Sequence, residues 1–396
     1  MAGVWDDLVG QADAVTTLRR AVAGARSGEG HSMTHAWLFT GPPGSGRSNA
    51  ARAFAAALQC ERGGCGECTD CRTALSGAHP DVTLVRTEKL SIGVDEVREL
   101  VRTAAMSPVL GRYQVIVVED ADRVTDRGAD ALLKAIEEPA ARTVWILCAP
   151  NPDEVVITIR SRTRLLRLAT PTDAGVADLL VRRDGIDPVM ASYAARAAQG
   201  HIGRARVLAR DEAARDRRRR VLDIPGQLTS IGACLTAADN LVKASADEAA
   251  AAATADLDAK ETAELSEALG MGTKGARPRH ATAALKDLEE QQKARAKRLQ
   301  RDSLDRVLTE LTTWYRDVLG IQTGALDLAL PTRDGEGPHL INAEQSHQVA
   351  QAARASTPEQ TLRRIDAILA TRESLEQNVA PLIAMEALMV SLADPR

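Results

Sequence analysis

The chain has 396 residues, enough for two or three domains, and apolar residues make up 44% of it, as in a globular protein with an ample core. Lysine and arginine number 50 against 54 aspartates and glutamates, and this net charge of −4 argues against a protein that coats nucleic acid with its whole surface. Aromatic residues make up 2% of the chain, which excludes extensive stacking on single-stranded bases as its main activity.

The sequence gives no sign of a membrane segment or an export signal. No apolar stretch approaches the roughly 18 residues that are needed to span a bilayer. The N-terminus carries acidic residues where a signal peptide needs a basic start followed by an apolar run. We therefore expect a cytoplasmic protein that makes no membrane contact.

The first half of the chain alternates short apolar runs with helical patterns. Runs rich in branched residues predict strands at 36–40, 81–85, 114–120, 143–149 and 164–168. Helical patterns occupy 48–59, the stretch from 94, and 129–139. This alternation predicts the α/β class, with a doubly wound parallel sheet covered by helices.

Beyond Pro171 the strand signal ends and the patterns become helical. Amphipathic helices are expected over 171–221, and an Ala- and Leu-rich all-α region over 222–396. Between 247 and 280 the periodicity weakens near glycine and proline residues, so part of that stretch is predicted to be an exposed, mobile insertion. The α/β module itself is assigned to residues 1–170.

A glycine-rich turn separates the first predicted strand from its helix. It matches the phosphate-loop pattern GxxxxGK[ST] except that arginine replaces lysine, and its residues are Gly41, Pro42, Pro43, Gly44, Ser45, Gly46, Arg47 and Ser48. The backbone N–H groups of such a loop bind phosphate, and Ser48 is placed to meet magnesium. A guanidinium is wider than a lysine ammonium, so binding of ATP or ADP stays open while efficient hydrolysis is not expected.

Two acidic residues, Glu119 and Asp120, end the predicted strand 114–120. A Walker B motif has acids at this place to hold magnesium and polarise water. Its usual order is aspartate then glutamate, so here the longer side chain stands at the metal position and the shorter one at the water position. Solvated acids at a strand end are the alternative interpretation, and the reversed order argues against hydrolysis at this site.

Four of the six cysteines fall within twelve residues, at Cys60, Cys65, Cys68 and Cys71. In a reduced compartment such a cluster favours a metal over disulfides. Four thiolates on short turns suit tetrahedral zinc and leave no position for water, which predicts a structural zinc ion. An iron–sulfur cluster and unligated thiols are the alternatives, and the C-x3-C-P continuation of a ferredoxin run is absent from the sequence.

Taken in order, these motifs resemble the clamp-loader family of bacterial DNA polymerase III, AAA+ proteins that open the sliding clamp. The resemblance is also carried by VWDDLVGQ at 4–11, by DALLKAIEEP at 130–139, and by TIRSRTR at 158–164, which is similar to the family's Ser-Arg-Cys motif. It spans residues 4–205. It implies an AAA+ module with a zinc-binding insertion, a helical lid at 171–221 and an all-α collar at 222–396 that mediates oligomerisation.

Three departures from the motor subunits of that family resemble its delta-prime subunit. They are Arg47, the Glu119–Asp120 order, and Gly203 where the motors' sensor arginine would stand. The resemblance implies a stator of the polymerase III holoenzyme, a nucleotidyltransferase assembly, that supports ATP-driven loading of the sliding clamp onto primed DNA. Its implied partners are the gamma/tau motors and the delta subunit.

The resemblance also gives Arg162, next to Ser161, the role of an arginine finger that acts on a neighbour's ATP. From the residues alone, Arg162 is a surface arginine in a basic loop. Two other functions stay open: an ATP-hydrolysing gamma/tau-like motor, and a zinc-bearing DNA-binding protein that uses the eight arginines between 204 and 220. A solvated helical face, or contact with an acidic neighbouring subunit, accounts for those arginines better than contact with DNA does.

Overall fold

The computed structural model describes residues 3–27, 32–87, 91–251, 254–268, 279–326 and 339–393. Contacts between residues separate the chain into two compact units, Met1–Arg210 and Asp211–Arg396. Within the described ranges, none of the helices combines the length and the apolarity that a bilayer crossing requires. Each unit is described by itself below.

A five-stranded parallel sheet forms the centre of the first unit, as the sequence predicts. Its strands stand in the order β2-β3-β4-β1-β5 and all neighbouring pairs run parallel. The strands are β1 (Ala36–Thr40), β2 (Val82–Val85), β3 (Gln114–Val118), β4 (Thr143–Ala149) and β5 (Arg164–Arg167). β3 ends two residues earlier than expected, so the acids at 119 and 120 lie just beyond its carboxyl end.

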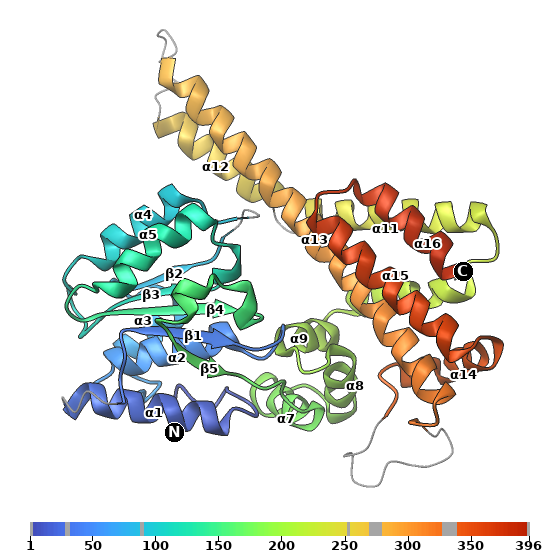
Figure 1. Ribbon diagram of the computed structural model, residues 1–396, viewed down its shortest axis with the longest axis horizontal. Helices are drawn as coiled ribbons and strands as arrows, with labels where there is room; N and C mark the ends of the chain where they lie inside the picture. Colours follow the sequence, from blue (N-terminus) through green and yellow to red (C-terminus); the bar gives the residue numbers. More distant parts are fainter. Residues whose placement is uncertain are drawn as a thin grey trace. The chain divides into compact units, whose positions relative to one another are not determined.

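Helices cover both faces of this sheet (Figure 1). Because successive strand residues point to opposite faces, Trp37 and Phe39 pack on one side while Leu38 packs on the other. The first side carries α1 (Ala12–Ser27), α2 (Arg47–Gln59) and α3 (Thr69–Ser76), and the second carries α4 (Val94–Ala104) and α5 (Asp126–Glu137). The result is the three-layer arrangement of a doubly wound α/β fold.

The Ala-rich sequence of α2 lets that helix lie close to the sheet, with Ala50, Ala53 and Ala57 fully or almost fully buried. α5 begins three residues before the predicted helix at 129, because the Thr125 side chain accepts a hydrogen bond from Gly128 N (3.3 Å) and caps the helix N-terminus.

Four short helices complete the first unit beyond β4. α6 (Ile157–Arg160) precedes β5, and α7 (Asp173–Asp184), α8 (Pro188–Ala198) and α9 (Ile202–Arg210) follow it and pack together. The single-turn 3-10 helices of this unit are η1 (Ala121–Arg123) and η2 (Pro152–Glu154). Glycine at 185 ends α7 in the left-handed conformation, as its position after the predicted helix suggests.

The second unit is entirely helical in its described part. Its helices are α10 (Glu212–Asp223), α11 (Ile231–Ala251), α12 (Thr254–Ala268), α13 (Arg279–Gln322), α14 (Ser346–Ala355), α15 (Pro358–Glu376) and α16 (Pro381–Ala393), with the short turns η3 (Ile224–Gly226) and η5 (Ala343–Gln345). Its core gathers residues of α13 and α16, among them Leu308, Trp314 and Met385. The expected domain boundary at 221 falls inside α10, whereas the contacts divide the chain at 210; the three-domain division stays a prediction.

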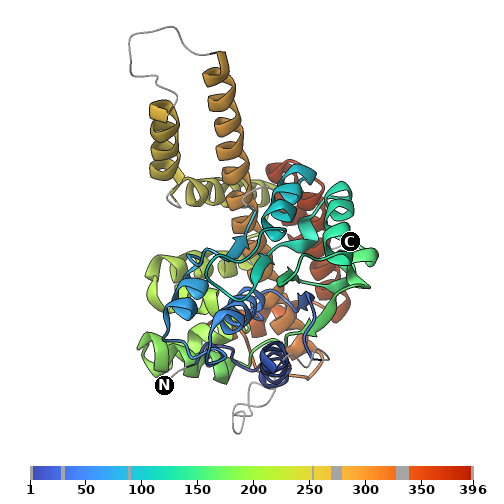
Figure 2. The same ribbon diagram turned by 90° about the vertical axis from the view of Figure 1, so that its left-hand side faces the viewer.

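The stretch 247–280 is helical where the structure describes it. α11 continues to Ala251, α12 spans Thr254–Ala268, and α12 lies alongside the first part of α13 in both views (Figure 1 and Figure 2). Gln292 Nε2 donates to Asp258 O (3.0 Å), and Arg295 pairs with Glu261 (2.9 Å). Residues 252–253 and 269–278, the rest of the predicted insertion, lie outside the described residues.

Candidate functional site

The predicted phosphate loop joins the carboxyl end of β1 to the N-terminus of α2. Gly44 and Gly46 have φ of 88° and 87°, a left-handed conformation that favours glycine and lets the chain turn tightly into the helix. α2 starts at Arg47 without a side-chain cap, so the loop presents the backbone N–H groups of a helix N-terminus. The sequence pattern therefore folds into the strand–loop–helix geometry that it predicts.

Two segments from elsewhere in the unit hold this loop. The Gln11 amide donates to Ser45 O (3.2 Å) and Ala169 O (2.7 Å) and accepts from Ala169 N (3.0 Å). On another side, His201, which immediately precedes α9, packs so closely on Gly44 that a Cβ there would lie 2.5 Å from the His201 Cα. Gly203 follows in the first turn of α9. Segment 4–11, through Gln11, and His201, just before α9, thus both contact the loop.

The guanidinium of Arg47 turns back onto the loop, where its Nη1 donates to Gly41 O. Burial lowers the pKa of Arg47 from its usual value, and the nearby Cys148, Asp122 and Asp120 offset that effect only in part. An arginine nevertheless keeps its charge in proteins. The side chain that would meet the phosphates of a nucleotide is thus already engaged with the backbone of its own loop.

Glu119 and Asp120 follow β3 at the same carboxyl edge of the sheet. Arg52, five residues after Arg47 on α2, pairs with Glu119 through Nη2 (2.8 Å) and Nε (3.2 Å), and the Glu119 side chain is 8% exposed. A magnesium ion at Glu119 would have to compete with the Arg52 guanidinium for this largely buried carboxylate. The sequence singled out Glu119 but not Arg52, because 67 residues separate the pair and no local pattern connects them.

Ser161 and Arg162 lie at the opposite edge of the sheet, between α6 and β5. Arg164 pairs in register with Trp37 near the amino end of β1, whereas the phosphate loop follows Thr40 at its carboxyl end. The four steps along β1 from Ala36 to Thr40 separate these edges by about 13 Å, at roughly 3.3 Å per step. The structure therefore does not bring Arg162 to the phosphate loop of its own chain.

The Arg162 side chain is 42% exposed and has three contacts within the unit. Nη1 donates to Thr158 O (3.0 Å) and Ser161 Oγ (3.2 Å), and Nε forms an ion pair with Glu137 Oε1 (2.5 Å). The Ser161 hydroxyl donates to Thr158 O (3.0 Å). Sequence reasoning missed Glu137, the last residue of α5.

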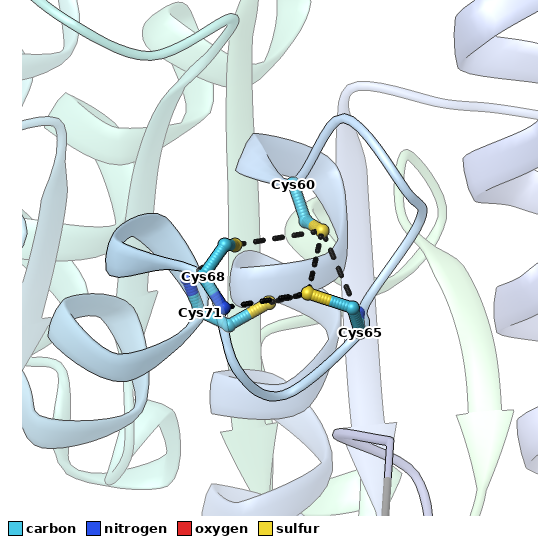
Figure 3. Close-up of side chains that lie close together, drawn as sticks. All are labelled: Cys60, Cys65, Cys68 and Cys71. Atoms are coloured by element: carbon cyan, nitrogen blue, oxygen red, sulfur yellow. Dashed lines mark hydrogen bonds between the residues drawn. The ribbon is translucent and has the colours of Figure 1, made fainter. Parts of the chain in front are cut away.

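The four clustered cysteines meet around one point (Figure 3). Their Sγ atoms all lie within 4.8 Å of one another, with Cys60–Cys65 and Cys60–Cys68 at 3.7 Å and Cys65–Cys71 at 4.0 Å. A tetrahedral ion with metal–sulfur bonds of about 2.3 Å would place its sulfurs about 3.8 Å apart. The donor set therefore fits a four-coordinate metal ion.

The local fold lowers the pKa of two thiols of this cluster, those of Cys60 and Cys65, whereas burial raises the pKa of the other two, those of Cys68 and Cys71. Cys60 ends α2 and Cys68 caps α3, so both helices contribute a ligand at a terminus. Backbone N–H groups of Glu67 and Cys68 lower the pKa of the Cys65 thiol to about 6. With all four positions taken by protein, such an ion would be structural. Segment 4–11 packs here as well, since Val4 N donates to Gly64 O (3.1 Å) in the cysteine loop.

The arginine-rich stretch at 204–220 is divided between the two units, since α9 ends at Arg210 and Asp211 caps α10. Arg206 and Arg210 pair with Asp184 (2.7 and 3.1 Å). Arg218 is 3% exposed in its side chain and contacts three partners in the second unit, Glu310, Asn342 and Glu344. These arginines therefore serve ion pairs within their own units.

The sheet order, the loop after β1 and the acids after β3 define an AAA+ module, and a helical region follows it in the chain. A family model described as DNA polymerase III, delta subunit, matches residues 13–172. The chain is 37% identical over 162 residues to subunit gamma/tau of Mycobacterium tuberculosis H37Rv, which covers 40% of this chain and 27% of that protein. It is also 37% identical over 160 residues to subunit delta' of Escherichia coli K12, covering 39% and 47%.

This part of the chain is therefore similar to the gamma/tau and delta' subunits of DNA polymerase III. The chain matches less than half the length of these two curated relatives. A crystal structure of a gamma subunit-related protein from Thermotoga maritima aligns with 95% of this chain and 99% of its own, with 15% identity and a TM-score of 0.41, a similarity too low to bear on function.

Proposed function

We propose that the protein is a delta-prime-like stator of the DNA polymerase III clamp loader. In this role it supports ATP-driven loading of the sliding clamp onto primed DNA and supplies Arg162 to ATP held by a neighbouring gamma/tau subunit. The delta subunit is a further partner in the assembly. Zinc, held by the four cysteines, stabilises the first unit without taking part in the reaction.

One observation carries this proposal: Arg162 lies at the opposite edge of the sheet from the phosphate loop of its own chain. A guanidinium stabilises the charge of a transferring phosphoryl group only when it touches that group. Arg162 is half-exposed at a surface, so a nucleotide on a second protein is the one that it can reach. The topology of the sheet thus supports an action of Arg162 in trans.

The phosphate loop of this chain supports a role in which the neighbouring subunit, and not this one, hydrolyses ATP. Arg47 is bound to the Gly41 carbonyl, and Glu119 is bound to Arg52. Nucleotide hydrolysis needs a cation at the phosphates and a metal at the first acid of the Walker B motif. Both groups are engaged with other residues of the same chain, and we therefore assign little or no independent ATPase activity to it.

The test is ATP turnover of the reconstituted loader with the Arg162→Ala variant. We expect ATP hydrolysis at the site that receives Arg162 to slow by roughly 10³–10⁵. Turnover of the whole assembly should then fall by the fraction that this site contributes to it. Arg160→Ala is the matched control, since Arg160 is a neighbouring arginine that pairs with Asp153 on its own surface. Unchanged turnover with Arg162→Ala, in an assembly that still forms, would refute the role.

A gamma/tau-like motor is the second candidate, because a gamma/tau relative matches at the same 37% identity as the delta' relative. The two functions differ in what the isolated chain does. Magnesium-dependent hydrolysis by the purified chain, abolished by Ser48→Ala, would establish the motor. Absence of turnover in the isolated chain, together with the loss caused by Arg162→Ala in the assembly, would establish the stator.

A further inference from the structure

We propose that Glu137 is the positioning residue for Arg162, the acid that holds the guanidinium in the orientation in which it meets an anion on another molecule. This inference rests on the proposed function, in which Arg162 acts in trans. It assigns to Glu137 a task that neither the motif around Arg162 nor the helix pattern at 130–139 contains.

The guanidinium of Arg162 is held from two directions. Nη1 donates to Thr158 O (3.0 Å) and to Ser161 Oγ (3.2 Å), both in the segment that carries Arg162 itself. Nε is 2.5 Å from Oε1 of Glu137, which comes from a different element, α5. Contacts within its own segment would leave the side chain free to move together with that segment. The contact to α5 fixes its position relative to the rest of the unit.

Glu137 stands on a rigid part of the fold. The preceding residue, Ile136, is 1% exposed in the core, and its carbonyl accepts a hydrogen bond from His35 Nε2 (2.8 Å) just before β1. The end of α5 is thereby fixed to the sheet. A functional side chain is held best by a residue whose own position is locked by packing and hydrogen bonds.

The ion pair with Glu137 could either position Arg162 for a nucleotide or hold it away from one, and the exposure of the two side chains decides between these effects. Arg162 and Glu137 are 42% and 40% exposed in their side chains, and an ion pair of this kind shifts an equilibrium by about fivefold or less. An incoming triphosphate therefore overcomes it at little cost. Misplacement of a reacting group by about 1 Å, in contrast, costs on the order of 10² in rate. Orientation is thus the larger effect of the contact.

The experiment measures ATP turnover of the complete loader with sliding clamp and primed DNA. Glu137→Gln is expected to cause only part of the loss in kcat that Arg162→Ala causes, up to about 10² against roughly 10³–10⁵ at the site that receives Arg162. KM for ATP should stay within about twofold, because the finger acts in the transition state. Glu137→Asp keeps the charge on a shorter side chain and is expected to recover part of the rate. Glu138→Gln, which removes the same charge one residue further along, is the matched control and is expected to be silent.

A double variant shows whether Glu137 acts through Arg162. When Arg162 is already alanine, Glu137→Gln should cause no further loss, since residues that act as one unit are not additive. Wild-type turnover with Glu137→Gln beside a clear loss with Arg162→Ala would overturn this inference and leave the proposed function standing. No loss with Arg162→Ala would overturn both. An equal loss with Glu138→Gln would show a general effect of charge and would overturn the positioning role.

Discussion

The four-cysteine site allows the most quantitative prediction. Cys60 and Cys71 are 1% and 0% exposed and belong to the core beneath α2 and α3, so a metal bound by them would link two helix termini inside the first unit. Zinc present at about 1,000 times its dissociation constant stabilises the folded state by up to about 4 kcal/mol. For a unit of about 210 residues, one kcal/mol corresponds to about 2–4 °C in melting temperature. Removal of zinc is therefore expected to lower Tm by up to about 8–16 °C.

Elemental analysis and calorimetry test this directly. We expect one zinc per chain in the purified protein, a Tm that falls on chelation, and recovery when zinc is returned. Cys68→Ala should lose the metal, because three thiolates do not complete the tetrahedron. Cys234→Ala removes a buried cysteine of α11 outside the cluster and should keep the full zinc content. A metal content far from one zinc, or a Tm that does not respond to chelation, would refute the assignment.

Three further predictions concern stability and are measured by urea unfolding. Asp81 is 1% exposed and accepts hydrogen bonds from the backbone N–H groups of Val109, Leu110 and Gly111; burial alone would raise its pKa, but these donors outweigh burial and lower it. Asp81→Asn should therefore lower the free energy of unfolding by about 2–3 kcal/mol at neutral pH. The difference from wild type should shrink as pH falls below about 4, because a carboxylate with a depressed folded-state pKa stabilises the fold only while it is ionised. A constant difference down to about pH 2 would contradict this. Arg218→Met should lower the free energy of unfolding by about 3–5 kcal/mol, because it removes the cation that pairs with the nearly buried Glu310. Arg219→Met, at an exposed position, should change it by about 0.5 kcal/mol or less. Equal effects of the two variants would contradict a stabilising role of the buried ion pair. Gly44→Ala should lower the free energy of unfolding more than Gly46→Ala, since both glycines have positive φ but only a Cβ at Gly44 would clash with His201. Similar losses, on the order of 1–2 kcal/mol each, would show that His201 moves aside without further loss of stability.

The sheet could be predicted because its strands are buried on both faces. The runs at 36–40 and 143–149 coincide with β1 and β4, and every residue of both strands is buried. Such strands appear in a sequence as continuous apolar runs, which need no knowledge of the rest of the fold. The phosphate loop and the cysteine cluster were equally predictable, since their residues are close together in sequence and their spacing defines their geometry.

Partners that come from distant elements could not be predicted. The ion pair of Arg52 with Glu119 joins residues 67 positions apart, and that of Arg162 with Glu137 joins a turn to a helix end. Charged residues occur at many surface positions, and packing alone decides which of them meet. α12 was missed for a related reason: its amphipathic pattern is weak, and polar contacts such as Arg295 with Glu261 accompany its packing on α13.

The two arginines of the proposed function, Arg47 and Arg162, lie at opposite ends of the same parallel strands. Arg47 follows the carboxyl end of β1 and is engaged by Gly41 O, whereas Arg162 precedes β5, the strand paired with β1, at the amino end. Parallel strands place their loops at two opposite edges, so a residue at one edge cannot serve a ligand bound at the other. A chain built in this way can lose catalysis at its carboxyl edge without losing the guanidinium at its amino edge. The two sites can therefore change independently, as a subunit that assists a neighbour requires.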